Sequence, residues 1–133
     1  MTRDERFPPS CRLRHQRDFD RVFHARCSVG QDDLVVYAAA NQTDTSRLGL
    51  SVSRRVGNAV RRNKWKRWLR EAFRRQRPEL PAGFDFVIVV RARSKPRGAT
   101  PAGPSTAEVT FAGVHQLLAQ LCWRAARRWE RRR

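Results

Sequence analysis

The sequence predicts an α+β protein in which a single-layer mixed β-sheet of about four strands packs with helices, in the order αβββαβα. Two kinds of periodicity and the chain length support this prediction. Apolar or alternating runs typical of strands interrupt segments with helical spacing of apolar residues. At 133 residues with 40% hydrophobic content, the chain is long enough for one modest core. We therefore expect a single domain over residues 1–133, with its core at about residues 12–128.

The first helix is predicted from about Gln16 to Arg26. It follows a polar, basic arm over residues 1–12 that is expected to be mobile or extended. Phe19, Val22 and Phe23 recur at helical spacing, which gives this helix an aromatic face. On the residues alone, the two phenylalanines are best interpreted as core side chains.

Three strands are expected next, around Cys27–Val29, over Leu34–Ala40 and over Arg47–Ser53. In the last of these, large apolar residues alternate with small ones, so that Gly49 and the neighbouring serines share one face. That face either leaves backbone and hydroxyl groups open to a ligand or lies under a packed helix. The polar turn at residues 41–46 predicts that the second and third strands form an antiparallel hairpin.

The segment over residues 54–77 is the most basic part of the chain, and Glu71 is its one acid. Asn58 can cap a helix that ends before Pro78. Cations at i,i+4 spacing repel one another, and Glu71 relieves little of this through Arg67 or Arg75. Helical geometry places Trp65, at the flank, with Trp68, Leu69, Ala72 and Phe73 on one face, and Asn63, Lys66, Arg67, Arg70 and Arg74 on the opposite face. The segment therefore predicts an amphipathic helix that binds a polyanion.

The C-terminal part is predicted to hold a central strand over Phe84–Val90, because its residues are β-branched and almost continuously apolar. A loop over Ser94–Pro104 follows, and Ser105 and Glu108 have the spacing of a capping box for a final helix. The apolar stripe of this helix is Val114, Leu117, Leu118, Leu121 and Ala125.

A net charge of +17 and a pI near 11.7 indicate an anionic partner, which could be nucleic acid, a membrane surface or an acidic protein. No apolar run approaches the roughly 20 residues that span a bilayer, and no secretory signal opens the chain. Cys11, Cys27 and Cys122 are too widely spaced to indicate a disulfide framework or a zinc site. We expect a cytoplasmic protein with no membrane partner.

No catalytic residue is predicted. Metal-dependent cleavage of RNA requires clustered carboxylates, and the acids here are scattered. Cleavage without a metal requires paired acid and base groups, whereas the three histidines occur in unrelated segments.

The stretch Ser51–Phe73, SVSRRVGNAVRRNKWKRWLREAF, resembles the signature of the bacterial ribonuclease P protein component. The resemblance extends to the Asp18-Phe19-x-x-Val22-Phe23 pattern, to an aromatic strand with Tyr37 and to the strand Asp85–Val90, and it covers about residues 12–128. Lys64 stands where the family usually has arginine, and the loop over Ser94–Pro104 is longer than usual.

This resemblance implies an RNA-binding subunit of ribonuclease P, an endoribonuclease whose chemistry lies in its RNA. Its partners would be the catalytic RNA and the 5′ leader of precursor tRNA, with no small-molecule substrate. Mg²⁺ would be required by the complex and bound mainly by RNA, and metal-ligating residues in this chain are not identified. The resemblance also implies a left-handed βαβ crossover, the reverse of the hand usual for such units.

Site residues follow from the matching motif positions. Arg62, Asn63, Lys66, Arg67 and Arg70 would form the RNA-contacting surface, which extends over Arg54, Arg55, Asn58, Arg61, Lys64 and Arg74. Phe19, Phe23, Tyr37, Ser51 and Ser53 would line a cleft for the leader.

Two other functions stay open on the residues alone. The chain could be another non-catalytic protein that binds structured RNA, such as a ribosomal protein or an RNA chaperone. It could also be a protein-only nuclease, which would cleave precursor tRNA without an RNA subunit.

Overall fold

A computed structural model of the chain describes residues 11–91 and 110–132. The predicted α+β class and the order αβββαβα are confirmed. The elements are α1 (Gln16–His24), β1 (Ser28–Gln31), β2 (Leu34–Ala40), β3 (Arg47–Val52), the 3₁₀ turn η2 (Arg54–Val56), α2 (Ala59–Gln76), the 3₁₀ turn η3 (Arg77–Glu79), β4 (Phe84–Val90) and α3 (Phe111–Arg131).

The four strands form one mixed sheet in the order β1-β2-β4-β3. Strand β4 pairs antiparallel with β2 and parallel with β3, so its predicted central position is confirmed. The predicted hairpin of Leu34–Ala40 with Arg47–Ser53 is wrong, because β4 lies between these two strands. All but one of the β4 side chains are buried, and a strand covered in this way must also pair along both edges. The polar turn at residues 41–46 joins β2 to β3 without pairing them.

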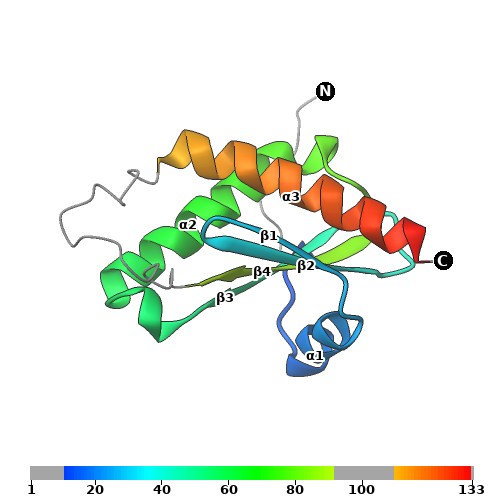
Figure 1. Cartoon of the computed structure of the whole chain (residues 1–133), viewed down its shortest axis with the longest axis horizontal. Coiled ribbons are helices and arrows are strands. Elements are labelled where there is room, and N and C mark those ends of the chain that lie inside the picture. Colours follow the sequence, from blue (N-terminus) through cyan, green and yellow to red (C-terminus); the bar gives the residue numbers. More distant parts are fainter. Residues whose placement is uncertain (1–10, 92–109, 133) are drawn as a thin grey trace, which may run out of the picture.

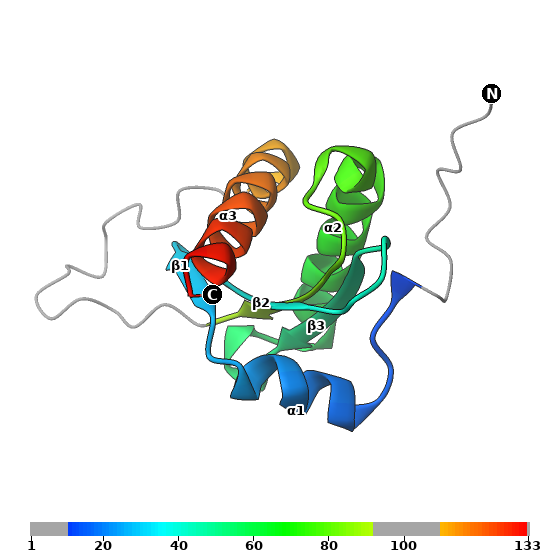
Figure 2. The ribbon, with the colours of Figure 1, turned by 90° about the vertical axis from the view of Figure 1, so that its right-hand side faces the viewer.

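Helices cover both faces of the sheet. In Figures 1 and 2, α2 and α3 lie side by side on one face, and α1 crosses the other. The chain passes from β3 over α2 to the parallel neighbour β4. Figure 1 gives the direction of β3 and Figure 2 the positions of β4 and α2, and the two views together show a left-handed crossover. The handedness implied by the family resemblance is therefore confirmed.

The main core lies between the sheet and the pair α2 and α3, and a smaller cluster lies beneath α1. In the smaller cluster, Leu13, Val22, Ala39 and Val87 are buried, with Phe19 and Phe23 partly buried against them. The apolar stripe predicted for the final helix faces the main core, although its Leu117 is only partly buried.

Several predicted boundaries need correction. Helix α1 ends at His24 rather than Arg26, because Arg26 has a left-handed φ of 55°. The end of the predicted arm over residues 1–12 is extended rather than mobile, because Cys11 is buried and Arg12 forms a β-bridge with Leu48. Residues 1–10 lie outside the described residues.

Helix α3 is capped by Thr110, whose side chain accepts a hydrogen bond from the Gly113 N–H at 3.1 Å. The predicted capping box at Ser105 and Glu108 and the loop over Ser94–Pro104 lie outside the described residues. Within the described part of the chain, no helix is both long and apolar enough to cross a membrane.

Candidate nucleic-acid interface

The basic helix α2 begins where the sequence predicts. Asn58 caps it by accepting a hydrogen bond from the Arg61 N–H at 3.0 Å. Gly57 precedes the cap with a φ of 154°, and a Cβ there would lie 2.7 Å from the Arg61 side chain. Glycine is therefore required for the sharp entry into the helix. The Asn58 side chain, predicted to bind RNA, is already used in this cap.

The inner face of α2 holds the helix to the sheet through Trp65, Leu69, Ala72 and Phe73, all buried as predicted. Trp65, placed by the sequence at the flank of this face, is the more deeply buried of the two tryptophans. Trp68 is half-buried, and its ring packs edgewise against Phe111 of α3 with centroids 6.2 Å apart. Both tryptophans thus serve packing, but Trp68 belongs to the contact between α2 and α3.

The outer face of α2, which we define as Asn63, Arg67, Arg70 and Arg74, points away from the sheet. Asn63, Arg67 and Arg70 are exposed and make no hydrogen bond or ion pair through their side chains within the described residues. Their charges and donors are therefore available to a partner. Arg62 and Lys66 are half-buried on the flank next to this face, and the buried Nε of Arg62 has no described partner.

Arg74 differs from the other members of the outer face because Glu71 holds it. Its Nε donates to Glu71 Oε2 at 3.1 Å, and its Nη2 forms a shorter contact with Oε1. Arg75 also donates to Glu71, at 2.9 Å. The expected pairing of Glu71 with Arg75 is confirmed, and Arg74 takes the place expected for Arg67. The hydrogen bond from Arg74, followed by that from Arg75, lowers the pKa of Glu71 despite some desolvation.

The remaining predicted RNA-binding residues surround the start of α2. Arg54 and Arg55 are exposed on the turn η2, and Arg61 is exposed in the first turn of the helix. Lys64 lies over the Trp68 ring, 4.7 Å from its centroid, and so points to the α3 side of α2. The predicted residues thus extend around the helix rather than over one face.

The residues predicted to line the leader cleft, apart from Ser53, come together on the α1 side of the sheet. Phe23 of α1 meets Tyr37 of β2 edge to face, with ring centroids 4.8 Å apart. Phe19 packs directly over Gly49, where an added Cβ would lie 2.8 Å from the ring. The small residues of β3 therefore serve two roles, since Gly49 lies beneath a helix while Ser51 is exposed beyond it.

Strand register adds two residues to this surface that the sequence did not indicate. Val89 pairs with Val35 on one side and with Ser51 on the other, so these three form one row across the sheet. Both valines are only half-buried. They could be assigned to this surface only with the strand order known. We define the α1-side surface as Phe19, Phe23, Val35, Tyr37, Ser51 and Val89.

Ser53 lies past the end of β3, where its hydroxyl caps the turn η2 by accepting from the Arg55 N–H at 3.1 Å. Its side chain is exposed, but it belongs to the turn before α2 rather than to the row of Ser51.

The α1-side surface is bounded at one end by the fully buried carboxylate of Asp85. Arg47 donates to both of its oxygens, at 2.7 Å and 2.6 Å, and Asn41 donates at 2.9 Å. Arg21 of α1 also donates to it. The hydrogen bonding of Arg47 to the Asp85 carboxylate, which accepts from it, is the main reason that the pKa of Arg47 is raised. Asp85 thereby anchors α1 across the sheet.

No group of three or more His, Cys, Asp or Glu comes together as metal ligands within residues 11–91 and 110–132. The three cysteines are free and buried, and burial raises the pKa of the Cys122 thiol. The described residues thus do not fit a dedicated metal site. What the geometry provides is exposed cations on α2 and a partly apolar surface beneath α1.

Comparison with known proteins gives one consistent result. The Ribonuclease P family model matches residues 7–125. The ribonuclease P protein component of Thermotoga maritima is 45% identical over 89 residues, which cover 67% of this chain and 76% of that protein. The corresponding protein of Thermotoga petrophila is 38% identical over 117 residues, or 88% of this chain and 93% of that one. A solved structure of the Thermotoga maritima protein superimposes with a TM-score of 0.70 at 39% identity, over 85% of this chain and 96% of that one.

Proposed function

The chain belongs to the ribonuclease P protein family, and on that premise we propose that the outer face of α2 binds the catalytic RNA while the α1-side surface holds the 5′ leader of precursor tRNA. The chain is the RNA-binding protein component of an endoribonuclease that acts in tRNA 5′ maturation, and its partner is the ribonuclease P RNA. The proposal concerns where each RNA segment lies.

The observation that supports the first contact is the availability of the cations on α2. Arg67 and Arg70 are exposed and unpaired among the described residues, next to Asn63 and the half-buried Arg62 and Lys66. Side chains three and four residues apart on a helix lie about 6 Å from one another, which is close to the spacing of phosphates on an RNA strand. Phosphates also relieve the repulsion between these cations, and arginine can bind them with two hydrogen bonds.

The second contact is supported by the chemistry of the α1-side surface. Unpaired bases stack on aromatic side chains, each for about 1–3 kcal/mol. Tyr37 is half-buried between the Phe23 ring and the open row of Val35, Val89 and Ser51. An extended single strand fits such a surface better than a duplex, whose bases are already stacked.

In this proposal the chain contributes position and charge. It neutralises phosphates on the catalytic RNA and gives the leader an additional binding surface. Because the described residues do not fit a metal site, we assign the Mg²⁺ that the complex requires to RNA ligands. We place the complex in the cytoplasm, since the three cysteines are all free thiols.

Cleavage of precursor tRNA by a cognate ribonuclease P RNA at low Mg²⁺, with and without this chain, tests the proposal. We expect strong stimulation for a substrate with a leader of several nucleotides and weaker stimulation for one with a single-nucleotide leader. Absence of any stimulation would overturn the proposal as a whole. Equal stimulation of the two substrates would overturn the leader contact.

A negative charge added to the α1-side surface separates the two contacts. Ser51→Glu adds a carboxylate at an exposed position and should reduce the advantage of the long leader without weakening binding of the catalytic RNA. Gln120→Glu adds the same charge at an exposed position of α3 and is the matched control.

A further inference from the structure

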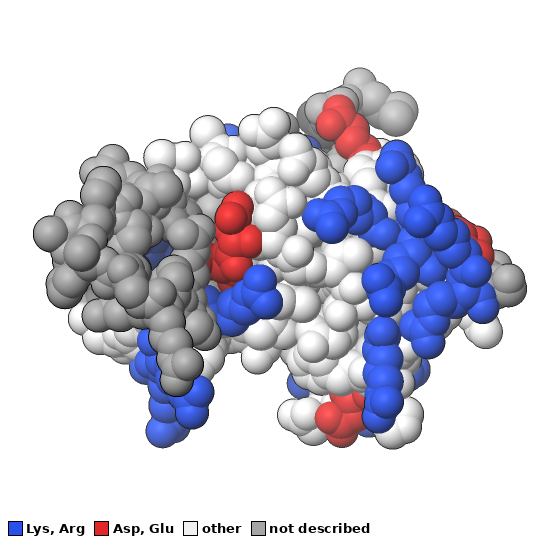
Figure 3. Space-filling model, in the orientation of Figure 1, with Lys and Arg blue, Asp and Glu red and all other residues white. Residues whose placement is uncertain are grey.

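The C-terminal half of α3 bears a second basic surface that the proposed function does not use. Arg124, Arg127, Arg128 and Arg131 recur at i, i+3, i+4 and i+7, so they lie along one side of the helix. All four are exposed. Figure 3 shows basic side chains gathered over this end of α3, at the right of the view. We call these four residues the α3 basic ridge.

The charges of the ridge are almost uncompensated. Arg124 donates to Gln31 Oε1 of β1 at 3.2 Å, a contact with a neutral group. Arg127, Arg128 and Arg131 form no ion pair with a carboxylate of the described residues. Cations one helical turn apart repel each other, so an anion bound along the ridge would stabilise this end of α3.

The ridge separates two hollows. One, of about 300 Å³, is lined by Val29 of β1 and by all four arginines of the ridge. The other, of about 410 Å³, lies on the opposite side of α3 and is lined by Pro81, Phe84, Trp123 and Ala126 together with Arg127 and Arg131. Because Arg127 and Arg131 line both hollows, a ligand in either one meets the same two guanidinium groups.

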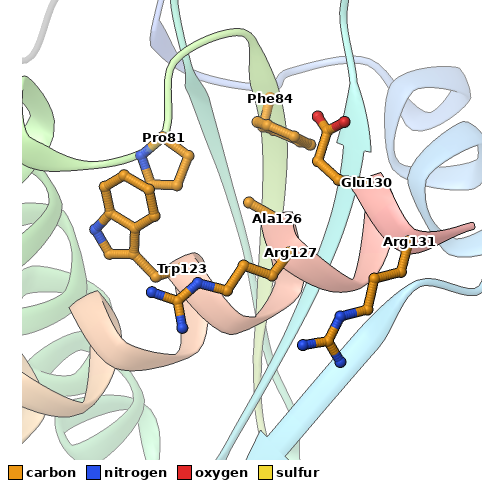
Figure 4. A pocket seen from close by; sticks show the side chains of 7 residues that line it. All are labelled: Pro81, Phe84, Trp123, Ala126, Arg127, Glu130 and Arg131. Carbon is orange, nitrogen blue, oxygen red and sulfur yellow. The ribbon is translucent and has the colours of Figure 1, made fainter. Parts of the chain in front are cut away.

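Trp123 makes the second hollow different from an ordinary basic patch. Its side chain is 43% exposed, although indole rings usually bury most of their surface. Figure 4 shows the ring beside Pro81, with the Arg127 side chain close to it. Glu130 also lines this hollow. A carboxylate repels phosphate, so the hollow favours a base over a phosphate.

We propose that the α3 basic ridge binds a single-stranded RNA segment, with phosphates along the four arginines and one base stacked on Trp123. The segment must be single-stranded because the indole can stack only on a base that is not already stacked in a duplex. Figure 2 shows α3 beside α2 in one layer over the sheet, so this surface lies on a different helix from the outer face of α2. Together with the two contacts of the proposed function, the chain would then contact three RNA segments.

The inference is tested by binding an oligouridylate of eight nucleotides to the full chain. The quenching of tryptophan fluorescence measures this binding. Trp123→Phe should remove most of the quenching and change the affinity less than about twofold, because phenylalanine retains a stacking face. Trp123→Ala should weaken binding about fivefold or more. Both substitutions are at an exposed side chain, and circular dichroism checks that the fold is retained.

The arginines are tested through the salt dependence of the same binding. Arg127→Ala/Arg128→Ala/Arg131→Ala should reduce the slope of log K against log salt by about 2, because each phosphate on a single strand contributes about 0.7. The corresponding triple lysine variant should retain the slope, since it retains the charge.

Three results would overturn the inference. Quenching that persists in Trp123→Phe would show that the signal comes from another tryptophan and not from a base on Trp123. An unchanged slope of log K against log salt in the triple alanine variant would show that the phosphates bind outside the α3 basic ridge. Binding of phosphatidylserine vesicles through the ridge, without binding of the oligouridylate, would identify a membrane surface as the ligand.

Discussion

Asp85 is the residue on which the position of α1 depends. Its carboxylate is fully buried and accepts hydrogen bonds from Arg21, Asn41 and Arg47, which come from α1, the turn after β2, and β3. A buried charge is costly unless it is paired. The network therefore joins the helix and the strands only as long as all of its members are present.

Asp85→Asn should destabilise the protein by about 3 kcal/mol, because it removes the charge that compensates two arginines. Unfolding in urea, followed by circular dichroism, measures this change in the free energy of unfolding. Asp20→Asn is the matched control, since Asp20 is exposed on α1 and should change stability by less than about 0.5 kcal/mol. Equal effects of the two substitutions would contradict the anchoring role of Asp85.

Glu71 gives the basic helix a pH-dependent contribution to stability. Hydrogen bonds from Arg74 and Arg75 lower its pKa in the folded protein, so the folded state favours the ionised carboxylate more than the unfolded state does. The contribution is fully present above the ordinary glutamate pKa of 4.5 and is lost as the pH falls through the lower folded pKa.

Glu71→Gln should therefore lower the free energy of unfolding at pH 7 by about 0.5 kcal/mol, a small effect because the pair is partly exposed. Below the folded pKa the wild type loses this advantage, so the difference between the two proteins should disappear. Thermal unfolding across pH 3 to 7 measures it. A difference that stays constant over this range would contradict the assigned ion pair.

At the scale of the element, the two faces of α2 have different roles. Its inner face packs on the sheet through Leu69 and Phe73, and its outer face presents cations to solvent. Glu71 holds Arg74, so this arginine must exchange a carboxylate for a phosphate when RNA binds. Arg67 and Arg70 have no such competitor among the described residues.

Arg62→Ala/Lys66→Ala/Arg70→Ala should weaken binding of the ribonuclease P RNA and reduce the slope of log K against log salt by about 2 to 3, if each side chain contacts one phosphate. Filter binding at several salt concentrations measures the slope. Arg14→Ala/Arg17→Ala/Arg26→Ala removes the same charge from exposed positions on the α1 side and is the control. Equal slopes of log K against log salt for the wild type and the α2 variant would show that the RNA phosphates do not bind these three side chains.

At the scale of the whole molecule, the elements were predictable and their arrangement was only partly so. The limits of β4 and the cap at Asn58 follow from local composition, which a sequence displays directly. Strand order does not follow from local composition, because it depends on which strands pair with the two edges of the buried strand β4. The polar turn after β2 suggested a hairpin, whereas burial of β4 on both faces favours its insertion between β2 and β3.

In the candidate site, too, some features were predictable from the sequence and others were not. Motif positions identify Arg67 and Arg70, which the structure leaves exposed. They do not indicate that Glu71 holds Arg74 or that Val35 and Val89 join the α1-side surface, since these contacts depend on side-chain rotamers and on register. Exposure of Trp123 was also beyond prediction, because an indole near an apolar stripe is normally buried.

The central position of β4 has a consequence for how the chain folds during its synthesis. Strands β2 and β3 leave the ribosome well before β4, and each pairs with it along its whole length. Until Val90 has emerged, both strands have an unpaired edge, and the core beneath α2 cannot close. Such long-range pairing slows folding. The basic helix is thus made while the sheet that supports it is incomplete, next to ribosomal RNA that offers it the same phosphates as its final partner.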